Sequence, residues 1–467
     1  MKKPVFLFFA AFALVATVRG EENPLAGISF DVPQTWPCKE LTGPGHRAIW
    51  VQGESWSGMP TRVFAYVVLP EGASAERKAP GVVLAHGGLG TAYLSWAETW
   101  ARHGYAAIVP DTCGALPIRI TGEKRAELRW ARTGVGGPHG WGRYDLADEA
   151  PGDQWPYHAV GALVRCHSYL RSLPEVDAEK TGLVGISWGG FLTMLAAAHD
   201  TRFKFAMPVY TCAFFDELEK YGPNRDRASF PRHLLDRWGE LFDPKHYVPK
   251  MTMPAMWFAS TNDSYFPFDL LQRTAALLPR RAQLAVRVRM AHSHGPHGEN
   301  MPELFRFADS VVRGGRPLPE LDCPTLENGE VSVRFDAKGQ ALKRFDLIWC
   351  TNAPPVAASA WQVKACPAPS GEVFTAQLPA GATRVYVNAV LEGDSGEEVY
   401  PETLVSSPTL SCGESLLEAK IAAKHKILVS DQWGGGHRII FDFNGRKGWI
   451  VEPKDPADGR PWVWTMQ

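Results

Sequence analysis

The chain has 467 residues, of which 45% are hydrophobic and 11% aromatic, and this composition fills more than one core and excludes a disordered protein. Its 49 basic and 50 acidic residues leave a formal net charge of -1, without a block of Lys and Arg. A nucleic-acid partner is therefore disfavoured.

The first twenty residues have the organisation of a secretory signal peptide. Two lysines precede an apolar run from Val5 to Thr17, and the small residues Val18 and Gly20 stand before the polar EEN. The apolar run is too short to span a bilayer, and no later stretch is long and apolar enough. We therefore predict that residues 1–20 are cleaved and that the protein is periplasmic or extracellular, with no membrane partner.

Export also bears on the eight cysteines. An oxidising compartment allows disulfides, although the sequence leaves their connectivity open. None of the cysteines forms a CxxC motif, which weakens zinc and thiol redox interpretations.

The next part of the chain alternates between strand and helix patterns. A hairpin is predicted from two alternating runs, 47–52 and 61–70, around a Gly-containing turn. Short, continuously apolar runs then alternate with helix-length amphipathic segments, which is typical of buried parallel strands with crossover helices. The predicted strands include 81–88, which ends in glycines, 106–111, 181–187, 204–210, 254–260 and 284–290. The predicted helices are 93–103, 188–199, 268–278 and 302–312.

Two segments interrupt this alternation. Residues 112–156 are rich in Gly, Trp and charge, and residues 214–250 have a helical, amphipathic pattern. Insertions at the carboxyl ends of strands in α/β sheets shape a ligand crevice or simply elaborate the surface, and the sequence favours neither alternative.

After residue 316 the helical patterns end. Residues 321–411 contain short alternating runs separated by Gly, Pro and Ser turns, which predicts an antiparallel β-sandwich. The predicted organisation is a signal peptide (1–20), an α/β domain (21–316), a sandwich (317–413) and a C-terminal segment (414–467).

A Gly-x-Ser-x-Gly motif occupies residues 185–189, after an apolar strand and at the start of a helix. This is the context of a nucleophile elbow, in which a tight turn lifts the Ser187 hydroxyl clear of the sheet. Oxyanion donors are then expected from the N–H of Trp188 and from the earlier strand end AHGG, at Gly87 and Gly88. A plain strand-to-helix turn is the alternative for AHGG.

The acid and the base are expected after the serine, in the order Ser, Asp, His. Asp263 follows the strand 254–260 directly, although a turn-capping aspartate is the alternative there. The segment RMAHSHGPHGEN follows the last predicted strand and supplies His292, His294 and His297. A zinc site built from these histidines and Glu299 is the alternative to a catalytic base.

These motifs together resemble the secreted α/β-hydrolases of the acetyl xylan esterase and dienelactone hydrolase group, which are related to prolyl oligopeptidase-type catalytic domains. The resemblance covers about residues 45–315 and rests on PGVVLAHGGLG, DQWPYHAVGALV, GISWGGFLTM and RMAHSHGPHGEN. It implies a serine esterase with an α/β-hydrolase fold, acting on acyl groups of plant polysaccharides or similar esters. It also implies His292 as the base, with His294 as the alternative, and a fibronectin-like sandwich.

The C-terminal segment resembles the opening of a second hydrolase that stops before any elbow. A hairpin that caps the sandwich is the alternative.

The leading functional hypothesis is a secreted carboxylesterase that needs no cofactor or metal and acts on a small-molecule or polysaccharide ester. Trp141 and Trp155, together with Trp188, are candidates for an aromatic sugar platform, with core packing as the alternative. The competing hypotheses are a prolyl oligopeptidase-like peptidase and a non-catalytic carbohydrate-binding protein on a hydrolase scaffold.

Overall fold

The computed structural model describes most of the chain after residue 22. The described residues are 23–221, 227, 229–351, 357–393, 396–397, 399–412, 425–433, 436–443, 445–453 and 465–466. The predicted signal peptide, residues 1–20, lies outside them. No helix in the described part is long and apolar enough to cross a membrane. All eight cysteines are described, and each is a free thiol.

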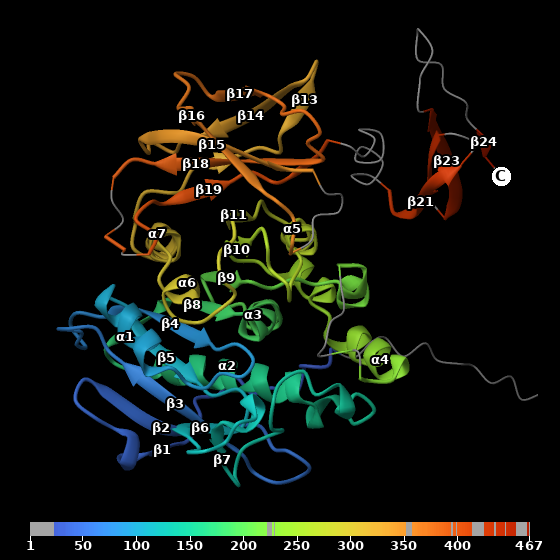
Figure 1. The fold of residues 1–467 in the computed structure, drawn as a ribbon. Helices are drawn as coiled ribbons and strands as arrows, with labels where there is room; N and C mark the ends of the chain where they lie inside the picture. The colour runs from blue at the N-terminus through green and yellow to red at the C-terminus, as the bar shows by residue number, and fades with distance from the viewer. Residues whose placement is uncertain are drawn as a thin grey trace, which may run out of the picture.

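A nine-stranded sheet forms the centre of the molecule (Figure 1). Its spatial order is β1-β2-β3-β5-β4-β8-β9-β10-β11. Strands β1 to β3 are antiparallel to their neighbours, and the pairs from β5 to β11 are parallel. The strands are β1 (Thr35–Pro37), β2 (His46–Gln52), β3 (Arg62–Val68), β4 (Ala79–Ala85), β5 (Ala106–Pro110), β8 (Val176–Ile186), β9 (Phe205–Val209), β10 (Met256–Ser260) and β11 (Gln283–Arg287).

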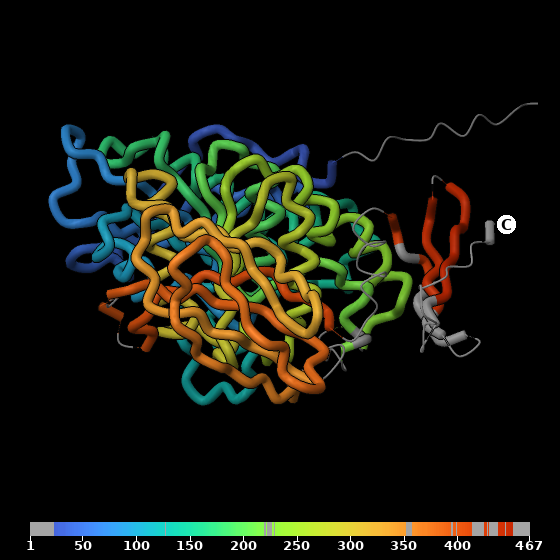
Figure 2. The backbone as a smooth tube through the Cα atoms, turned by 90° about the horizontal axis from the view of Figure 1, so that it is seen from above, coloured from blue at the N-terminus to red at the C-terminus, as the bar shows by residue number. Residues whose placement is uncertain are grey.

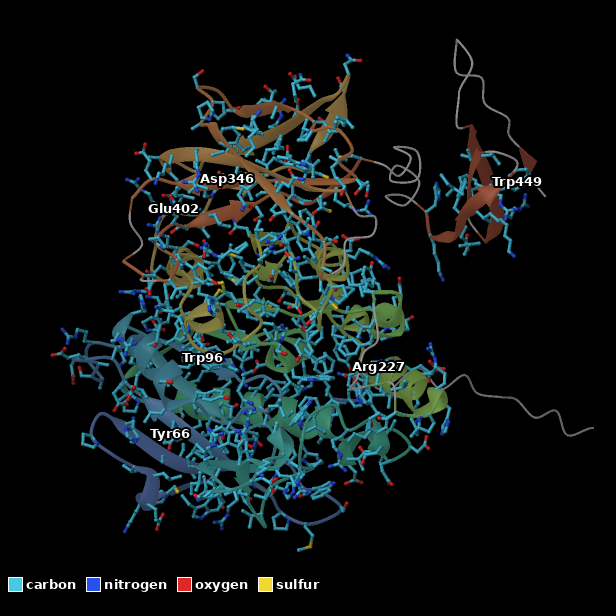
Figure 3. The ribbon with its side chains drawn as sticks, in the orientation of Figure 1. Tyr66, Trp96, Arg227, Asp346, Glu402 and Trp449 are labelled. Carbon is cyan, nitrogen blue, oxygen red and sulfur yellow. The ribbon has the colours of Figure 1, made fainter. Side chains whose placement is uncertain are left out.

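Helices cover both faces of this sheet, which explains why β4, β5, β9 and β10 are buried along their whole length. Trp96 of α1, labelled in Figure 3, belongs to the core cluster that α1 and α7 form on one face. Phe191 of α3 belongs to the core cluster that α2, α3 and α5 form on the other face. The helices are α1 (Leu94–Arg102), α2 (Trp155–Ser172), α3 (Trp188–His199), α4 (Arg232–Phe242), α5 (Phe268–Ala275), α6 (Pro296–Glu299) and α7 (Pro302–Val312). The predicted α/β class is confirmed.

The two predicted insertions contain short elements. Residues 112–156 form a two-stranded ribbon, β6 (Ala115–Arg119) with β7 (Trp130–Arg132), together with the 3-10 helices η2 (Ala126–Leu128), η3 (Tyr144–Leu146) and η4 (Pro151–Asp153). Residues 214–250 contain α4 and the 3-10 helices η5 (Phe215–Tyr221), η6 (Pro244–His246) and η7 (Val248–Lys250). The remaining 3-10 helix, η1 (Lys39–Leu41), lies near the start of the sheet.

Two antiparallel sheets follow the α/β region. One contains β12, β13, β14 and β17, and the other contains β15, β16, β18, β19 and β20. Arg344 on β15 bridges Asp346 and Glu402, both labelled in Figure 3. The strands are β12 (Glu320–Leu321), β13 (Thr325–Glu327), β14 (Glu330–Asp336), β15 (Leu342–Cys350), β16 (Gln362–Pro367), β17 (Val373–Gln377), β18 (Arg384–Leu391), β19 (Leu404–Ser406) and β20 (Leu410–Ser411).

The sandwich packs against β11, the last strand of the central sheet (Figure 1). The buried side chain of Asn388 donates to the Val286 carbonyl at 3.1 Å and accepts from Ser406 Oγ at 2.6 Å. Ser406 Oγ in turn accepts from the Val286 N–H at 2.8 Å. Because these bonds satisfy the exposed edge of β11, the sandwich closes the sheet at that side.

The C-terminal segment forms a four-stranded antiparallel sheet in its described parts, with β21 (Ile427–Trp433), β22 (Gly436–Phe443), β23 (Arg446–Pro453) and β24 (Thr465–Met466). Figures 1 and 2 show it apart from the rest of the described chain. Ile439, Phe441 and Ile450 form its own small core. The segment 461–464, on which the comparison with a second hydrolase partly rests, lies outside the described residues, so its origin stays open.

Candidate active site

The Gly-x-Ser-x-Gly turn has the geometry of a nucleophile elbow. Ser187 stands between β8 and α3 with a φ of +58°, a left-handed conformation that non-glycine residues rarely adopt. Its N–H donates to the Val209 carbonyl at 2.8 Å, which ties the strained turn to the neighbouring strand. A Cβ on Gly189 would overlap the carbonyl of Ala85, so the turn needs glycine at this position.

Ser187, His292 and Asp263 form a chain of hydrogen bonds. His292 Nε2 lies 2.9 Å from Ser187 Oγ, and His292 Nδ1 lies 2.6 Å from Asp263 Oδ2. The Asp263 side chain is 2% exposed, and its second oxygen accepts the N–H groups of Tyr265 and Phe266. These three side chains follow β8, β10 and β11, whose carboxyl ends meet at one edge of the sheet. The carboxylate selects the imidazole tautomer whose Nε2 accepts the serine proton.

Two backbone N–H groups beside Ser187 have no acceptor within the described residues: those of Gly88 and Trp188. The N–H of Gly87, the third predicted oxyanion donor, already has an acceptor. Gly87 N–H donates to His294 Nε2 at 2.9 Å, and the Gly87 carbonyl lies 2.9 Å from Nδ1 of the buried His86. We therefore correct the expectation that Gly87 offers a free oxyanion donor, because two histidines hold its peptide groups.

The three histidines after β11 have separate partners. His294 Nδ1 bonds Glu299 Oε1 at 2.8 Å, whereas His297 Nδ1 lies 2.8 Å from the Tyr400 hydroxyl of the sandwich. Within the described ranges no group of three or more His, Cys, Asp or Glu side chains is arranged to hold a metal ion. The Gly87 N–H can only donate, so His294 Nε2 must accept this hydrogen bond. The His294 Nδ1–H therefore donates the hydrogen bond that Glu299 accepts.

A cavity of about 330 Å³ opens over Ser187. Its volume is at the lower end of the range for small-molecule sites. Besides the elbow, the oxyanion loop and the histidine loop, its lining is mostly aromatic and contains one arginine. These side chains are Tyr93, Arg129, Trp141, Tyr144, Trp188, Phe215, Tyr265 and Phe266.

Of the three tryptophans predicted to form an aromatic platform, Trp141 and Trp188 line this cavity and Trp155 does not. Trp155 is 1% exposed, donates its indole N–H to the Thr112 carbonyl at 2.8 Å and packs edge-on against Trp188. The prediction for Trp155 is therefore wrong, since this side chain belongs to the core beneath the site.

Several lining residues were missed from the sequence. Tyr93, whose pKa is raised by burial, is the N-cap residue of α1, and Tyr265 lies two residues after the predicted acid. The sequence signal for Tyr265 is its position two residues after Asp263. In the structure its exposed ring lies 4.9 Å from the His292 ring. Arg129 carries no local motif, so its place in the cavity emerges only from the fold.

Two family profiles match parts of the chain. The acetyl xylan esterase family matches residues 55–218, which include the AHGG loop and the elbow. The prolyl oligopeptidase family matches residues 149–308, which include the elbow, Asp263 and His292.

The individual relatives are more distant. A probable dipeptidyl-peptidase 5 of Aspergillus clavatus is 29% identical over 157 residues, which are 32% of this chain and 18% of that protein. The chain thus matches only about a fifth of the length of that curated relative. An acetyl xylan esterase from Paenibacillus sp. R4 is 20% identical, with a TM-score of 0.47 over 60% of this chain and 88% of the other. An acylaminoacyl peptidase from Pyrococcus horikoshii is 17% identical, with a TM-score of 0.44 over 59% of this chain and 43% of the other.

The order of the sheet gives the described chain the α/β-hydrolase fold. The chain is acetyl xylan esterase-like over residues 55–218 and similar to the prolyl oligopeptidase family over residues 149–308, with an additional β domain after the hydrolase fold.

Proposed function

We propose that the chain is an exported carboxylesterase that removes acyl groups, acetyl above all, from a carbohydrate or similar small ester. The observation that carries this proposal is the continuous chain of hydrogen bonds from Asp263 through His292 to Ser187 at the floor of the cavity. The acetyl xylan esterase profile over residues 55–218 favours an ester. The signal-like pattern of residues 1–20 favours export.

In this proposal Ser187 Oγ attacks the ester carbonyl while His292 Nε2 takes its proton. The carbonyl oxygen becomes an oxyanion, which the N–H groups of Gly88 and Trp188 stabilise. His292 then protonates the departing alcohol, and Asp263 keeps the imidazole oriented and stabilises its charged form. Water, activated by the same histidine, hydrolyses the acyl-enzyme and releases the acid.

The cavity supports a substrate with a sugar or another planar-faced group. Tyr93, Trp141 and Tyr265 line the cavity together with Ser187, and aromatic rings can pack against the apolar faces of a substrate while its polar edges stay hydrated. In this proposal Trp141 is a substrate contact and Trp155 supports the site from the core.

The test compares wild type with Ser187→Ala on p-nitrophenyl acetate and on acetylated polysaccharides. We expect wild type to release p-nitrophenolate and acetate, and Ser187→Ala to lose roughly 10⁴-fold or more in kcat. Equal background rates in both proteins would overturn the proposal and favour a non-catalytic carbohydrate-binding protein.

Peptidase activity is the second candidate, because the prolyl oligopeptidase profile covers residues 149–308. Two chromogenic substrates, p-nitrophenyl acetate and a dipeptidyl p-nitroanilide, separate the two. A higher kcat/KM on the anilide would replace the esterase proposal with that of a peptidase.

A further inference from the structure

Arg129 is fixed at the wall of the cavity. Its Nε donates to the Leu89 carbonyl at 3.1 Å, and the indole N–H of the next residue, Trp130, donates to the same oxygen at 3.0 Å. Leu89 directly follows Gly88 on the oxyanion loop and has a φ of +60°. The guanidinium therefore lies beside the loop that borders the nucleophile, and neither of its Nη groups has an acceptor among the described residues.

Arg129 is the one permanently charged side chain among the residues that line the cavity. No Asp or Glu belongs to that lining, and no carboxylate in the described part of the chain lies within ion-pair distance of Arg129. Its neighbours in the same insertion differ, since Arg125 pairs with Glu123 at 3.1 Å and Arg143 pairs with Asp145 at 2.8 Å. The cavity thus holds a cation without a protein anion.

Arg129 is half-buried at a cavity whose lining is mostly aromatic. Removing a guanidinium from water in this way costs free energy unless an anion compensates it. The planar fork of Arg suits a carboxylate, to which it donates two parallel hydrogen bonds. We propose that the substrate ester carries a carboxylate group and that Arg129 binds it. This inference rests on the proposed esterase function and narrows its substrate class.

The carboxylate takes no part in bond making. Ser187 still attacks the ester carbonyl, the alcohol still leaves with the proton from His292, and the anion only anchors the molecule in the cavity. The group has two possible positions, on the acyl side, as in a half ester of a dicarboxylic acid, or on the alcohol side, as in an acylated uronic acid.

Each position is tested with a pair of substrates that differ only in charge. The acyl pair is p-nitrophenyl hemisuccinate and its methyl ester, followed through p-nitrophenolate. The alcohol pair is acetylated glucuronic acid and its methyl ester, followed through released acetate. For each pair the readout is the ratio of kcat/KM for the anionic member to that for the neutral member.

We expect wild type to prefer the anionic member of one pair, and Arg129→Gln to lower that ratio by about tenfold to a hundredfold, the range for a charge-assisted hydrogen-bonded contact. Arg129→Lys keeps the positive charge but lacks the planar guanidinium, so its ratio should lie between those of wild type and Arg129→Gln. Arg125→Gln removes a cation from the same insertion that is already paired outside the cavity, so its ratio should equal that of wild type.

An unchanged ratio in Arg129→Gln, or no anionic preference in wild type on either pair, overturns this inference while leaving the esterase proposal intact. An equal loss on both members of a pair also overturns it, because it would show that Arg129 only holds the oxyanion loop. If neither wild type nor Ser187→Ala hydrolyses any of the four substrates above background, the esterase proposal fails and the inference fails with it.

Discussion

His294 offers a sharp test of how the oxyanion loop is held. Its Nε2 accepts the Gly87 N–H at 2.9 Å, and its Nδ1–H donates to Glu299. The next residue, Gly88, supplies one of the two proposed oxyanion donors. The substitution His294→Phe keeps a planar ring against Tyr93, whose ring lies 4.5 Å away, but removes both hydrogen bonds.

The expected loss in kcat follows from the position of the Gly88 N–H, which the hydrogen bond between Gly87 and His294 holds. Removing one oxyanion donor altogether costs about 10²- to 10³-fold in kcat, whereas here the Gly88 N–H remains and only its position is released. We therefore expect kcat to fall by about tenfold to a hundredfold, or about 1.4 to 2.7 kcal/mol in the barrier. KM should change little, because the loss is confined to the transition state.

The assay is p-nitrophenyl acetate turnover with kcat and KM determined separately. His297→Phe is the matched control, since His297 lies on the same loop and bonds Tyr400 of the sandwich. His292→Ala should lose far more, in the range expected for Ser187→Ala. If His294→Phe instead matches Ser187→Ala while His292→Ala stays active, His294 is the base; if His294→Phe matches wild type, the loop needs no such anchor.

Four further outcomes follow from the packing and charge of other residues. Trp155→Ala should lower the free energy of unfolding by about 3–5 kcal/mol, because it empties a buried site. Trp141→Ala should instead mainly raise KM, by about twofold to tenfold, and denaturant titration together with substrate kinetics separates the two effects. Burial lowers the pKa of His158 from 6.5 to about 4. The unfolded chain therefore binds a proton at His158 more readily than the folded chain does. The stability that is present above pH 6.5 is lost as the pH falls toward 4. In His158→Gln the decrease in the free energy of unfolding between pH 7 and 5 should therefore be about 2 kcal/mol smaller than in wild type. An unchanged pH dependence would contradict this assignment. Asn388→Ala leaves the buried Val286 carbonyl without its donor and should destabilise the protein by about 1–3 kcal/mol. Calorimetry should show the hydrolase fold and the sandwich shifting together, and a shift of the sandwich alone would show that the two unfold independently.

The features that could be predicted from the sequence are those with a local physical cause. The glycines around Ser187 indicate a turn too tight for a Cβ, and the apolar runs that precede Ser187 and Asp263 indicate buried strands whose carboxyl ends meet. The helix predicted at 302–312 matches α7 in both limits, since Pro302 is suited to the first turn. The helix predicted at 268–278 ends three residues later than α5 does, in keeping with the frayed ends that periodicity cannot resolve.

Other features depend on contacts that no local pattern encodes. Trp155 opens α2, and its sequence context does not tell which side of the helix faces the core. Arg129 enters the cavity because the β6–β7 ribbon folds over the oxyanion loop, which is 40 residues away in the sequence. The sequence left open whether the insertion 112–156 shapes a crevice or elaborates the surface. The structure shows that it contributes Arg129 and Trp141 to the cavity.

The two histidines of AHSH also have roles that the local sequence does not distinguish. His292 and His294 are separated by one residue, and each has Nδ1 on a carboxylate and Nε2 on a group that donates to it. The carboxylates therefore select the same tautomer in both rings. In the proposed mechanism the donor at Nε2 distinguishes the base from the anchor, because the Ser187 hydroxyl can give up its proton to the ring, whereas the Gly87 N–H cannot. Because Gly87 lies 207 residues from His294, the distinction is a property of the fold rather than of the motif.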